Sequence, residues 1–239
     1  MNKEELLTEL KVLGLELSED QLKKIDEFCN ILLSENKKYN LTAIKEYDQV
    51  LLKHVYDSLT IVKVVDLNQS YNLLDIGSGG GFPGIILKIV FPHLEITLLD
   101  SNGKKTKFLE LVKETLSLNG LTIINSRAEE YVIEKRESFD VVTARAVSDL
   151  NILLELSVPY QKIDGLFIAM KANAEEEIKN PKSACKILKC EIKDIIEFEL
   201  PIDNSRRTLI TVIKQDKTPS EYPRGYDKIL KKPLIINQK

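Results

Sequence analysis

The sequence predicts an α/β fold: a seven-stranded, mostly parallel sheet with a C-terminal antiparallel hairpin, preceded by a helical cap. From Tyr71 onward, short apolar runs alternate with helical patterns, as in parallel sheets covered on both faces. The residues before about 68 show helical patterns and no convincing strand, and the last two apolar runs are joined by a link too short for a crossover helix. We therefore expect a cap at residues 1–68 and a sheet domain at 69–239 with a basic tail at 216–239, in one compact unit.

The cap is predicted to contain three helices. The first carries an apolar stripe that Gly14 ends, made of Leu6, Leu7, Leu10 and Leu13. Ser18 and Gln21 form a capping box that opens the second helix. A third helix is expected over Tyr47–Val65.

The sheet domain is predicted from its apolar runs. Strands are expected at Leu73–Ile76, Leu94–Leu99, Leu121–Ile124, Phe139–Thr143, Leu166–Met170, Ile192–Leu200 and Thr208–Lys214. Helices are expected after Pro83, at Lys104–Leu118, at Leu150–Pro159 and around Ala174–Leu188. The helix at Lys104–Leu118 should turn Phe108, Leu111, Val112 and Leu116 inward, and Asp164-Gly165 should form the turn before the fifth strand.

The first strand of the sheet leads into a glycine-rich turn, Y-N-L-L-D-I-G-S-G-G-G-F-P-G at Tyr71–Gly84. Four of the five residues from Gly77 to Gly81 are glycine, so a ligand can approach the backbone closely. Asp75 would repel a pyrophosphate, but it could attract an ammonium group or hold the turn through backbone N–H groups.

Several functions of this turn compete. A P-loop is excluded because Ile85 stands where its lysine should be, and a dinucleotide fingerprint matches only as the lone set Gly79, Gly81, Gly84. A tight turn without a ligand is the structural alternative. The order D-x-G-x-G-x-G, from Asp75 to Gly81, resembles the first motif of class I S-adenosylmethionine-dependent methyltransferases.

Composition limits the class of protein. Apolar residues at 43% and charged residues at 30% are typical of an ordinary globular protein, and acids among the apolar residues of the N-terminus exclude a signal peptide and a membrane span there. We expect a cytoplasmic protein that does not contact a membrane. With three cysteines and two histidines, neither a disulfide framework nor a metal site is expected.

Charge is distributed unevenly along the chain. Residues 204–239 carry nine Lys or Arg against three Asp or Glu, although the whole chain has a net charge of −3. Six of the basic residues are predicted to contact a polyanion, mixed with Tyr222 and Tyr226 as stacking surfaces: Arg206, Arg207, Arg224, Lys228, Lys231 and Lys232. A solvated surface or an edge cover for the sheet is the alternative.

Residues just past the strands are the candidates for a ligand site, because ligands of open α/β sheets bind at the carboxyl ends of strands. Asp100 could accept both hydroxyls of an adenosine ribose, or it could cap the next helix. Ala128 and Glu129 could receive the adenine edge, although Glu129 could equally be a solvated acid. Phe82 could pack on the ligand or only on the sheet.

Motifs along most of the chain resemble the GidB or RsmG family of bacterial methyltransferases, which modify N7 of a guanosine in 16S ribosomal RNA. They are N-L-T-A-I, K-H-x-x-D-S, D-I-G-S-G-G-G-F-P-G, S-R-A-E-E, A-R-A-V, and Y-P-R with K-K-P, beginning at Asn40, Lys53, Asp75, Ser126, Ala144 and Tyr222. The resemblance implies binding of S-adenosyl-L-methionine, with a class I fold. The ribosomal RNA or the small ribosomal subunit would be the partner, and we expect a monomer.

The predicted cofactor site contains Asp75, Gly77, Gly79, Phe82, Asp100, Ser101, Asn102, Ala128, Glu129 and Arg145. The glycine motif supplies Asp75 and Gly79, and the family resemblance implies the others. His54 and Asp57 lie in a motif of the family, but we interpret them as a core histidine and a capping acid because neither follows a strand.

Arg145 is the predicted catalytic residue because it follows the fourth strand, opposite the glycine turn. An arginine cannot act as a base at neutral pH, so its role must be positional or electrostatic. An ion pair with Asp149 is the structural alternative.

The chain lacks the signatures of other nucleic-acid methyltransferases. T-A-R-A stands where exocyclic-amine enzymes carry N-P-P-Y, and no cysteine follows a core strand as in cytosine C5 enzymes. Guanine N7 needs no general base. A non-catalytic RNA-binding or assembly factor, a small-molecule methyltransferase and a nucleotide-dependent oxidoreductase remain alternatives.

Overall fold

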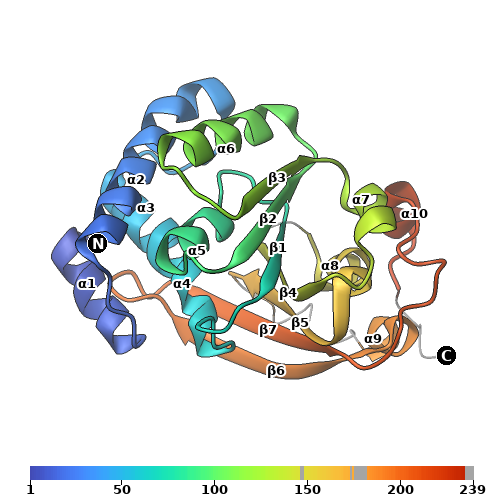
Figure 1. Cartoon of the computed structure of the whole chain (residues 1–239). Coiled ribbons are helices and arrows are strands. Elements are labelled where there is room, and N and C mark those ends of the chain that lie inside the picture. The colour runs from blue at the N-terminus through green and yellow to red at the C-terminus, as the bar shows by residue number, and fades with distance from the viewer. Residues whose placement is uncertain (146–147, 173, 175–181, 235–239) are drawn as a thin grey trace.

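The computed structural model describes residues 1–145, 148–172, 174 and 182–234, and one seven-stranded sheet runs through this part of the chain (Figure 1). The strand order is β3-β2-β1-β4-β5-β7-β6. The strands are β1 (Asn72–Ile76), β2 (Glu95–Asp100), β3 (Leu121–Asn125), β4 (Phe139–Arg145), β5 (Gln161–Lys171), β6 (Cys190–Glu199) and β7 (Arg206–Lys214). The seven predicted strands are thus confirmed.

Strands β1 to β5 pair in parallel, whereas β7 pairs antiparallel with both β5 and β6. The predicted C-terminal hairpin is therefore correct. The chain order reverses between β1 and β4, the neighbours at the centre of the parallel part. In open α/β sheets, ligands bind beyond the carboxyl ends of the strands at such a reversal.

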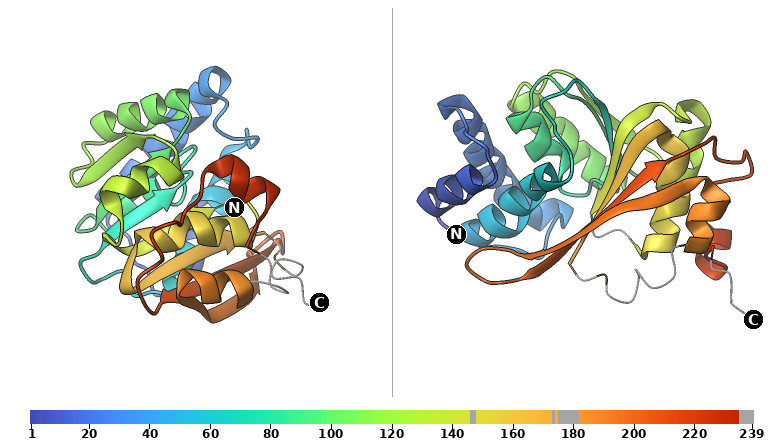
Figure 2. Two further views of the ribbon diagram at one scale, coloured as in Figure 1. Left: turned by 90° about the vertical axis from the view of Figure 1, so that its right-hand side faces the viewer. Right: turned by 90° about the horizontal axis from the view of Figure 1, so that it is seen from below.

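Helices cover both faces of the sheet (Figure 2). The N-terminal helices lie on one side with α5 (Gly84–Val90) and α6 (Gly103–Thr115). The opposite side holds α7 (Ala128–Lys135), α8 (Leu150–Ser157), the 3₁₀ turn η3 (Val158–Tyr160), α9 (Lys182–Leu188) and α10 (Tyr226–Lys231).

Side chains along each strand point alternately to the two faces of the sheet, and this produces two hydrophobic cores. Leu73 and Val141 belong to the core under the N-terminal helices, whereas their neighbours Leu74 and Val142 belong to the core under α8. Successive strand residues point to opposite faces, and both faces are covered. This is why the strands appear in the sequence as continuous apolar runs.

The N-terminal segment consists of α1 (Lys3–Val12), α2 (Glu19–Tyr39), and a third helical stretch made of α3 (Tyr47–Val50), the π-helical η1 (Leu51–Tyr56), α4 (Asp57–Leu59) and the 3₁₀ turn η2 (Thr60–Lys63). The capping box of Ser18 and Gln21 is confirmed at the start of α2. Buried residues of these helices share one core with α5 and α6. The division of the chain at residue 68 stays a prediction.

Some predicted details are wrong. Leu111 is 38% exposed, because α6 turns only Thr106, Phe108, Leu109 and Val112 fully inward. Strand β5 starts at Gln161, so Asp164-Gly165 lies within the strand, at an irregularity in its pairing with β4. Strand β4 extends to Arg145, which is the last residue of the strand. Part of the helix predicted around Ala174–Leu188 lies outside the described residues.

Candidate functional site

The glycine turn between β1 and α5 is the centre of the candidate site. Gly77, Gly79 and Gly81 all have positive φ angles, of 71°, 56° and 94°. A β-carbon on Gly81 would also come within 2.6 Å of Ile85 Cγ1, so both conformation and packing favour glycine there. The Gly79 N–H donates to Asp100 Oδ2 at 2.9 Å, which links the turn to the end of β2.

Asp75 lies beneath this turn and is fully buried. Its Oδ2 accepts from the Gly84 N–H at 3.0 Å, whereas Oδ1 has no hydrogen-bond partner among the described residues. Burial raises the pKa of Asp75 to about 7, and the bond from Gly84 opposes that change. Of the two predicted roles, holding the turn through a backbone N–H is confirmed. Contact with a cofactor stays a prediction, and Asp75 lines neither hollow described next.

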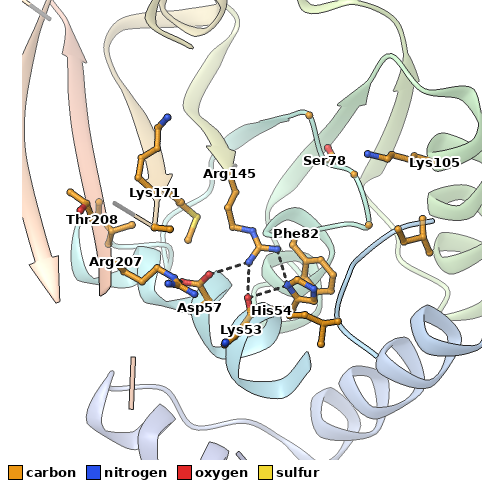
Figure 3. A pocket seen from close by; sticks show the side chains of 18 of the residues that line it. Lys53, His54, Asp57, Ser78, Phe82, Lys105, Arg145, Lys171, Arg207 and Thr208 are labelled. Atoms are coloured by element: carbon orange, nitrogen blue, oxygen red, sulfur yellow. Dashed lines mark hydrogen bonds and ion pairs between the residues drawn. The ribbon is translucent and has the colours of Figure 1, made fainter. Parts of the chain in front are cut away.

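Two hollows open beside the glycine turn and share Gly77 and Lys105. The first, of about 410 Å³, is called here the Arg145 hollow and lies between the turn, the N-terminal helices and the ends of β4, β5 and β7 (Figure 3). The second, of about 320 Å³, is called the Asp100 hollow and lies between the ends of β1, β2 and β3 and helix α10. Together they form the region at the topological reversal where a ligand is expected.

The Arg145 hollow is strongly cationic. Its charged lining consists of one acid, Asp57, and five cationic side chains, Lys53, Lys105, Arg145, Lys171 and Arg207. Figure 3 shows that they come from the helix before β1, from α6, and from the ends of three strands. An excess of positive charge in a concave, partly enclosed surface attracts anionic ligands.

Asp57 joins two of these cations. Arg145 Nη1 donates to Asp57 Oδ2 at 3.2 Å, and Arg207 Nε donates to Asp57 Oδ1 at 2.9 Å. Arg145 Nη1 also donates to the Lys53 carbonyl at 3.0 Å. The ion-pair partner of Arg145 is therefore Asp57, and the alternative of a pair with Asp149 is wrong. The interpretation of Asp57 as a capping acid is also wrong, because its carboxylate binds two arginines in the hollow.

His54 lies in the same hollow, stacked on Phe82 with the ring centroids 4.4 Å apart. Its Nε2 lies 2.7 Å from Thr42 Oγ1, and its Nδ1 lies 3.2 Å from Arg145 Nη2. Burial, and then the charge of Arg145, lower the pKa of His54 to about 3, so the ring is neutral at pH 7. His54 is hydrogen-bonded as predicted, but it borders the candidate site, contrary to its interpretation as a core residue.

Phe82 contacts Arg145 as well as His54, since the guanidinium of Arg145 lies 5.2 Å from the centre of the Phe82 ring. The side chain is 5% exposed. Packing of Phe82 on a ligand stays a prediction.

The Asp100 hollow contains several of the predicted cofactor residues: Gly77, Asp100, Ser101, Ala128 and Glu129. Asp100 Oδ1 accepts from the Asn102 N–H at 2.8 Å, and Asp100 Oδ2 holds Gly79. The N-cap of α6 is Asn102, whose side-chain oxygen accepts from the backbone N–H groups of Lys104 and Lys105. The alternative of Asp100 as that cap is therefore wrong. Asn102 lines neither hollow, and its contact with a cofactor stays a prediction.

The predicted RNA contacts differ in their surroundings. Arg224 donates to both carboxylate oxygens of the fully buried Glu155, so its guanidinium already has a partner inside the protein. Arg207 is bound to Asp57 and borders the Arg145 hollow. Arg206 lies at the start of β7, and Lys228, Lys231 and Lys232 are exposed in and after α10.

Sequence reasoning missed several lining residues, chiefly Lys53, Lys105, Lys171 and Tyr226. The motif K-H-x-x-D-S was the available signal for Lys53, His54 and Asp57. Tyr226 was assigned to an RNA-binding tail, but it lines the Asp100 hollow.

The described residues contain no group of three or more His, Cys, Asp and Glu side chains that could hold a metal ion. None of their helices has the length and the apolar character that crossing a membrane requires.

Comparison with solved structures identifies the fold. A mutant of MtNAS in complex with S-adenosylmethionine matches with a TM-score of 0.54 at 15% identity, covering 82% of this chain and 76% of that one. The YcgJ protein from Bacillus subtilis matches with a TM-score of 0.50 at 14% identity, covering 68% of this chain and 100% of that one. The seven-stranded sheet with its antiparallel hairpin is the fold of class I S-adenosylmethionine-dependent methyltransferases.

Sequence comparison identifies the family. The family model GidB, described as rRNA small subunit methyltransferase G, matches residues 21–208. Ribosomal RNA small subunit methyltransferase G of Caldanaerobacter subterraneus subsp. tengcongensis is 46% identical over 93% of this chain and 94% of its own length. The protein of that name from Bacillus subtilis is 44% identical over 94% and 95%. The chain therefore belongs to the GidB family of rRNA small subunit methyltransferases G.

Proposed function

We propose that this chain transfers a methyl group from S-adenosylmethionine to N7 of a guanosine in 16S ribosomal RNA of the small ribosomal subunit. One observation supports this above the others: a hollow with five cationic side chains meets the Asp100 hollow at Gly77. The first suits a base attached to a phosphate backbone, and the second suits a nucleoside. The two ligands of a methyl transfer would then meet at the glycine turn.

The residues of the Asp100 hollow fit the adenosine half of the cofactor. Asp100 supplies carboxylate oxygens at the end of β2, where ribose hydroxyls could donate. The apolar side chains of Ile76, Leu99 and Leu156 line the same hollow and suit a flat aromatic base. When bound, S-adenosylmethionine supplies an electrophilic methyl group on a positively charged sulfur.

The Arg145 hollow would hold the target guanosine, and its residues would act by orientation. Guanine N7 carries a lone pair and no proton, so the reaction requires no base. This agrees with His54, whose lowered pKa of about 3 makes it a weak base, and with Arg145, which stays protonated at neutral pH. Arg145 would donate to guanine O6 or clamp the cofactor carboxylate, held in place by Asp57.

The exposed lysines of α10 and its end, Lys228, Lys231 and Lys232, would contact RNA phosphates outside the hollow. Arg206 at the start of β7 would do the same. We also propose that the protein acts as a monomer in the cytoplasm, where ribosomal RNA is modified.

The test is direct. The purified protein is incubated with S-adenosylmethionine and with either 16S RNA or intact small subunits, and N7-methylguanosine is located by chemical cleavage at the modified base. We expect one modified guanosine. A modified exocyclic amine would contradict the proposed N7 chemistry.

The main alternatives give different results in the same assay. A non-catalytic assembly factor would bind RNA and transfer no methyl group. A small-molecule methyltransferase would consume S-adenosylmethionine without labelling RNA. The Arg145→Ala variant serves as the control, because its Asp100 hollow is unchanged while the cationic hollow loses its central side chain.

A further inference from the structure

Helix α10 forms a wall of the Asp100 hollow. Tyr226, its first residue, lines the hollow together with Asp100 and Ala128. The guanidinium of Arg127, at the start of α7, lies 5.7 Å from the centre of the Tyr226 ring. Figure 1 shows α10 beside α7, far along the chain from the strands that form the rest of the hollow.

The inner face of α10 is packed. Ile229 is fully buried in a small core with Ile152 and Leu156 of α8, and Tyr226 packs against the same core. Leu156 also lines the Asp100 hollow. The side of α10 that carries Tyr226 is therefore continuous with the apolar wall of the hollow.

A buried ion pair fixes the helix. Glu155 on α8 is fully buried and accepts three bonds from Arg224: from the backbone N–H at 2.9 Å, from Nε at 2.7 Å and from Nη2 at 2.5 Å. Arg224 Nη2 also donates to the carbonyl of Lys232 at 2.9 Å. Arg224 precedes α10 and Lys232 follows its last residue, so one side chain ties both ends of the helix to α8.

The segment before α10 is held as well. Arg136 donates to the carbonyl of Thr218 at 3.3 Å and to the carbonyl of Tyr222. A helix of six residues is not stable alone in water, so the position of α10 depends on these tertiary contacts. They all lead to α7 and α8, which border the Asp100 hollow.

We infer that α10 is a fixed wall of the S-adenosylmethionine pocket, in which Tyr226 packs on the adenosine half and the Arg224–Glu155 pair positions Tyr226. This inference rests on the placement of the cofactor under the proposed function. It assigns the C-terminal segment to cofactor binding, in addition to any contact with RNA. Arg224 and Glu155 are positioning residues, because neither lines the hollow.

The first test is calorimetry on Tyr226→Ala, with two ligands. S-adenosylmethionine and 5′-methylthioadenosine share the adenosine half and differ in the amino-acid half. Loss of an aromatic contact with a base should weaken the affinity for both ligands by about the same factor, roughly tenfold. Leu230→Ala is the matched control, since Leu230 is exposed on the same helix and lines neither hollow.

The outcomes separate this inference from the placement of the cofactor. Asp100→Asn should weaken the affinity for both ligands if the adenosine half binds in the Asp100 hollow. If Asp100→Asn weakens binding while Tyr226→Ala binds as tightly as Leu230→Ala, the inference about α10 is overturned. If neither variant changes affinity, the placement of the cofactor fails and the inference fails with it.

A double-mutant cycle tests the positioning role of Arg224. If Arg224 acts only by placing Tyr226, Arg224→Ala should weaken the affinity for S-adenosylmethionine, and adding it to Tyr226→Ala should weaken it no further. Additive losses would overturn the positioning role. Because Arg224→Ala leaves a buried carboxylate without its cation, the neutral pair Glu155→Gln with Arg224→Gln serves if that variant does not fold.

Discussion

Arg145 and Asp57 are joined by an ion pair of 3.2 Å, although 88 positions separate them in the sequence. Arg145 ends the central strand β4, and Asp57 starts the short helix α4 in the N-terminal segment. The same carboxylate binds Arg207 of β7. Asp57 therefore connects the helical segment, the parallel sheet and the C-terminal hairpin at one point of the cationic hollow.

Asp57→Asn should lower methyl transfer at least about tenfold, because Arg145 and Arg207 would lose the charge that orients them. It should also destabilise the protein by roughly 3 to 5 kcal/mol, since two largely buried cations lose their shared partner. Steady-state methylation of RNA and denaturant unfolding measure the two effects.

The control for Asp57 is an ion pair near the start of β4, the strand that Arg145 ends. Asp140 of β4 pairs with Lys162 of β5 at 2.7 Å, and both side chains are partly exposed. Lys162→Ala should cost at most about 1 kcal/mol and leave methyl transfer unchanged. Equal activity losses in the two variants would show that Asp57 has no special role in the hollow.

Arg145→Ala should reduce methyl transfer at least about tenfold at saturating S-adenosylmethionine and RNA, because a group that orients the base or the cofactor is lost. The melting temperature of Arg145→Ala should also decrease clearly, since Arg145 bonds to Asp57 and to the Lys53 carbonyl. Arg145→Lys should restore little of the methyl transfer, because an ammonium group cannot reproduce the contacts of a planar guanidinium. Near-normal turnover in Arg145→Ala, after correction for the folded fraction, would remove Arg145 from the chemistry.

The strands and their order of appearance were predictable because buried parallel strands leave continuous apolar runs in the sequence. The start of β5 was not. Asp164 adopts a positive φ of 65° and a β-carbon on Gly165 would come within 3.1 Å of the Asp140 carbonyl, so residues typical of a turn lie in an irregular part of a continuous strand. Local composition cannot distinguish a turn from such a bulge.

The candidate site was predictable where it depends on strand ends and glycines, as with Gly77 and Asp100. The partner of Arg145 was not predictable from local spacing. Asp149 lies four positions away, a spacing that makes two residues neighbours on a helix, but Arg145 is the last residue of a strand. Asp57 and Tyr226 reach the site only through tertiary packing, which spacing alone does not show.

Asp75 gives a prediction for pH dependence. Its pKa is raised from the ordinary value of 3.8 to about 7 by burial, so the folded state binds the proton more tightly than the unfolded chain. The resulting stabilisation is complete below about pH 4 and is lost as the pH rises through 7. Asp75→Asn keeps an acceptor for the Gly84 N–H and has no charge. It should therefore be more stable than the natural protein at pH 8, by roughly 4 kcal/mol at most.

The measurement is the free energy of unfolding of both proteins at pH 5 and pH 8. The advantage of Asp75→Asn should grow between these values. The comparison between the two proteins matters, because His54, whose pKa is lowered to about 3, has the opposite effect and destabilises the fold as the pH falls below about 6.5. An advantage that is the same at both pH values would show that Asp75 is charged throughout this range.

The lysines of α10 separate RNA binding from cofactor binding. Deletion of Pro219–Lys239 cannot do so, because it removes Tyr226 from the Asp100 hollow together with the basic residues. Replacing Lys228, Lys231 and Lys232 by Gln keeps the helix, since all three are exposed and only the Lys232 backbone is used by Arg224. Affinity for RNA should fall at low salt. Its dependence on salt should become less steep, because a protein that makes fewer phosphate contacts releases fewer counterions when it binds. Affinity for S-adenosylmethionine should stay the same. RNA binding with an unchanged salt dependence would place the RNA contacts of this protein elsewhere, at Arg206 or in the cationic hollow around Arg145.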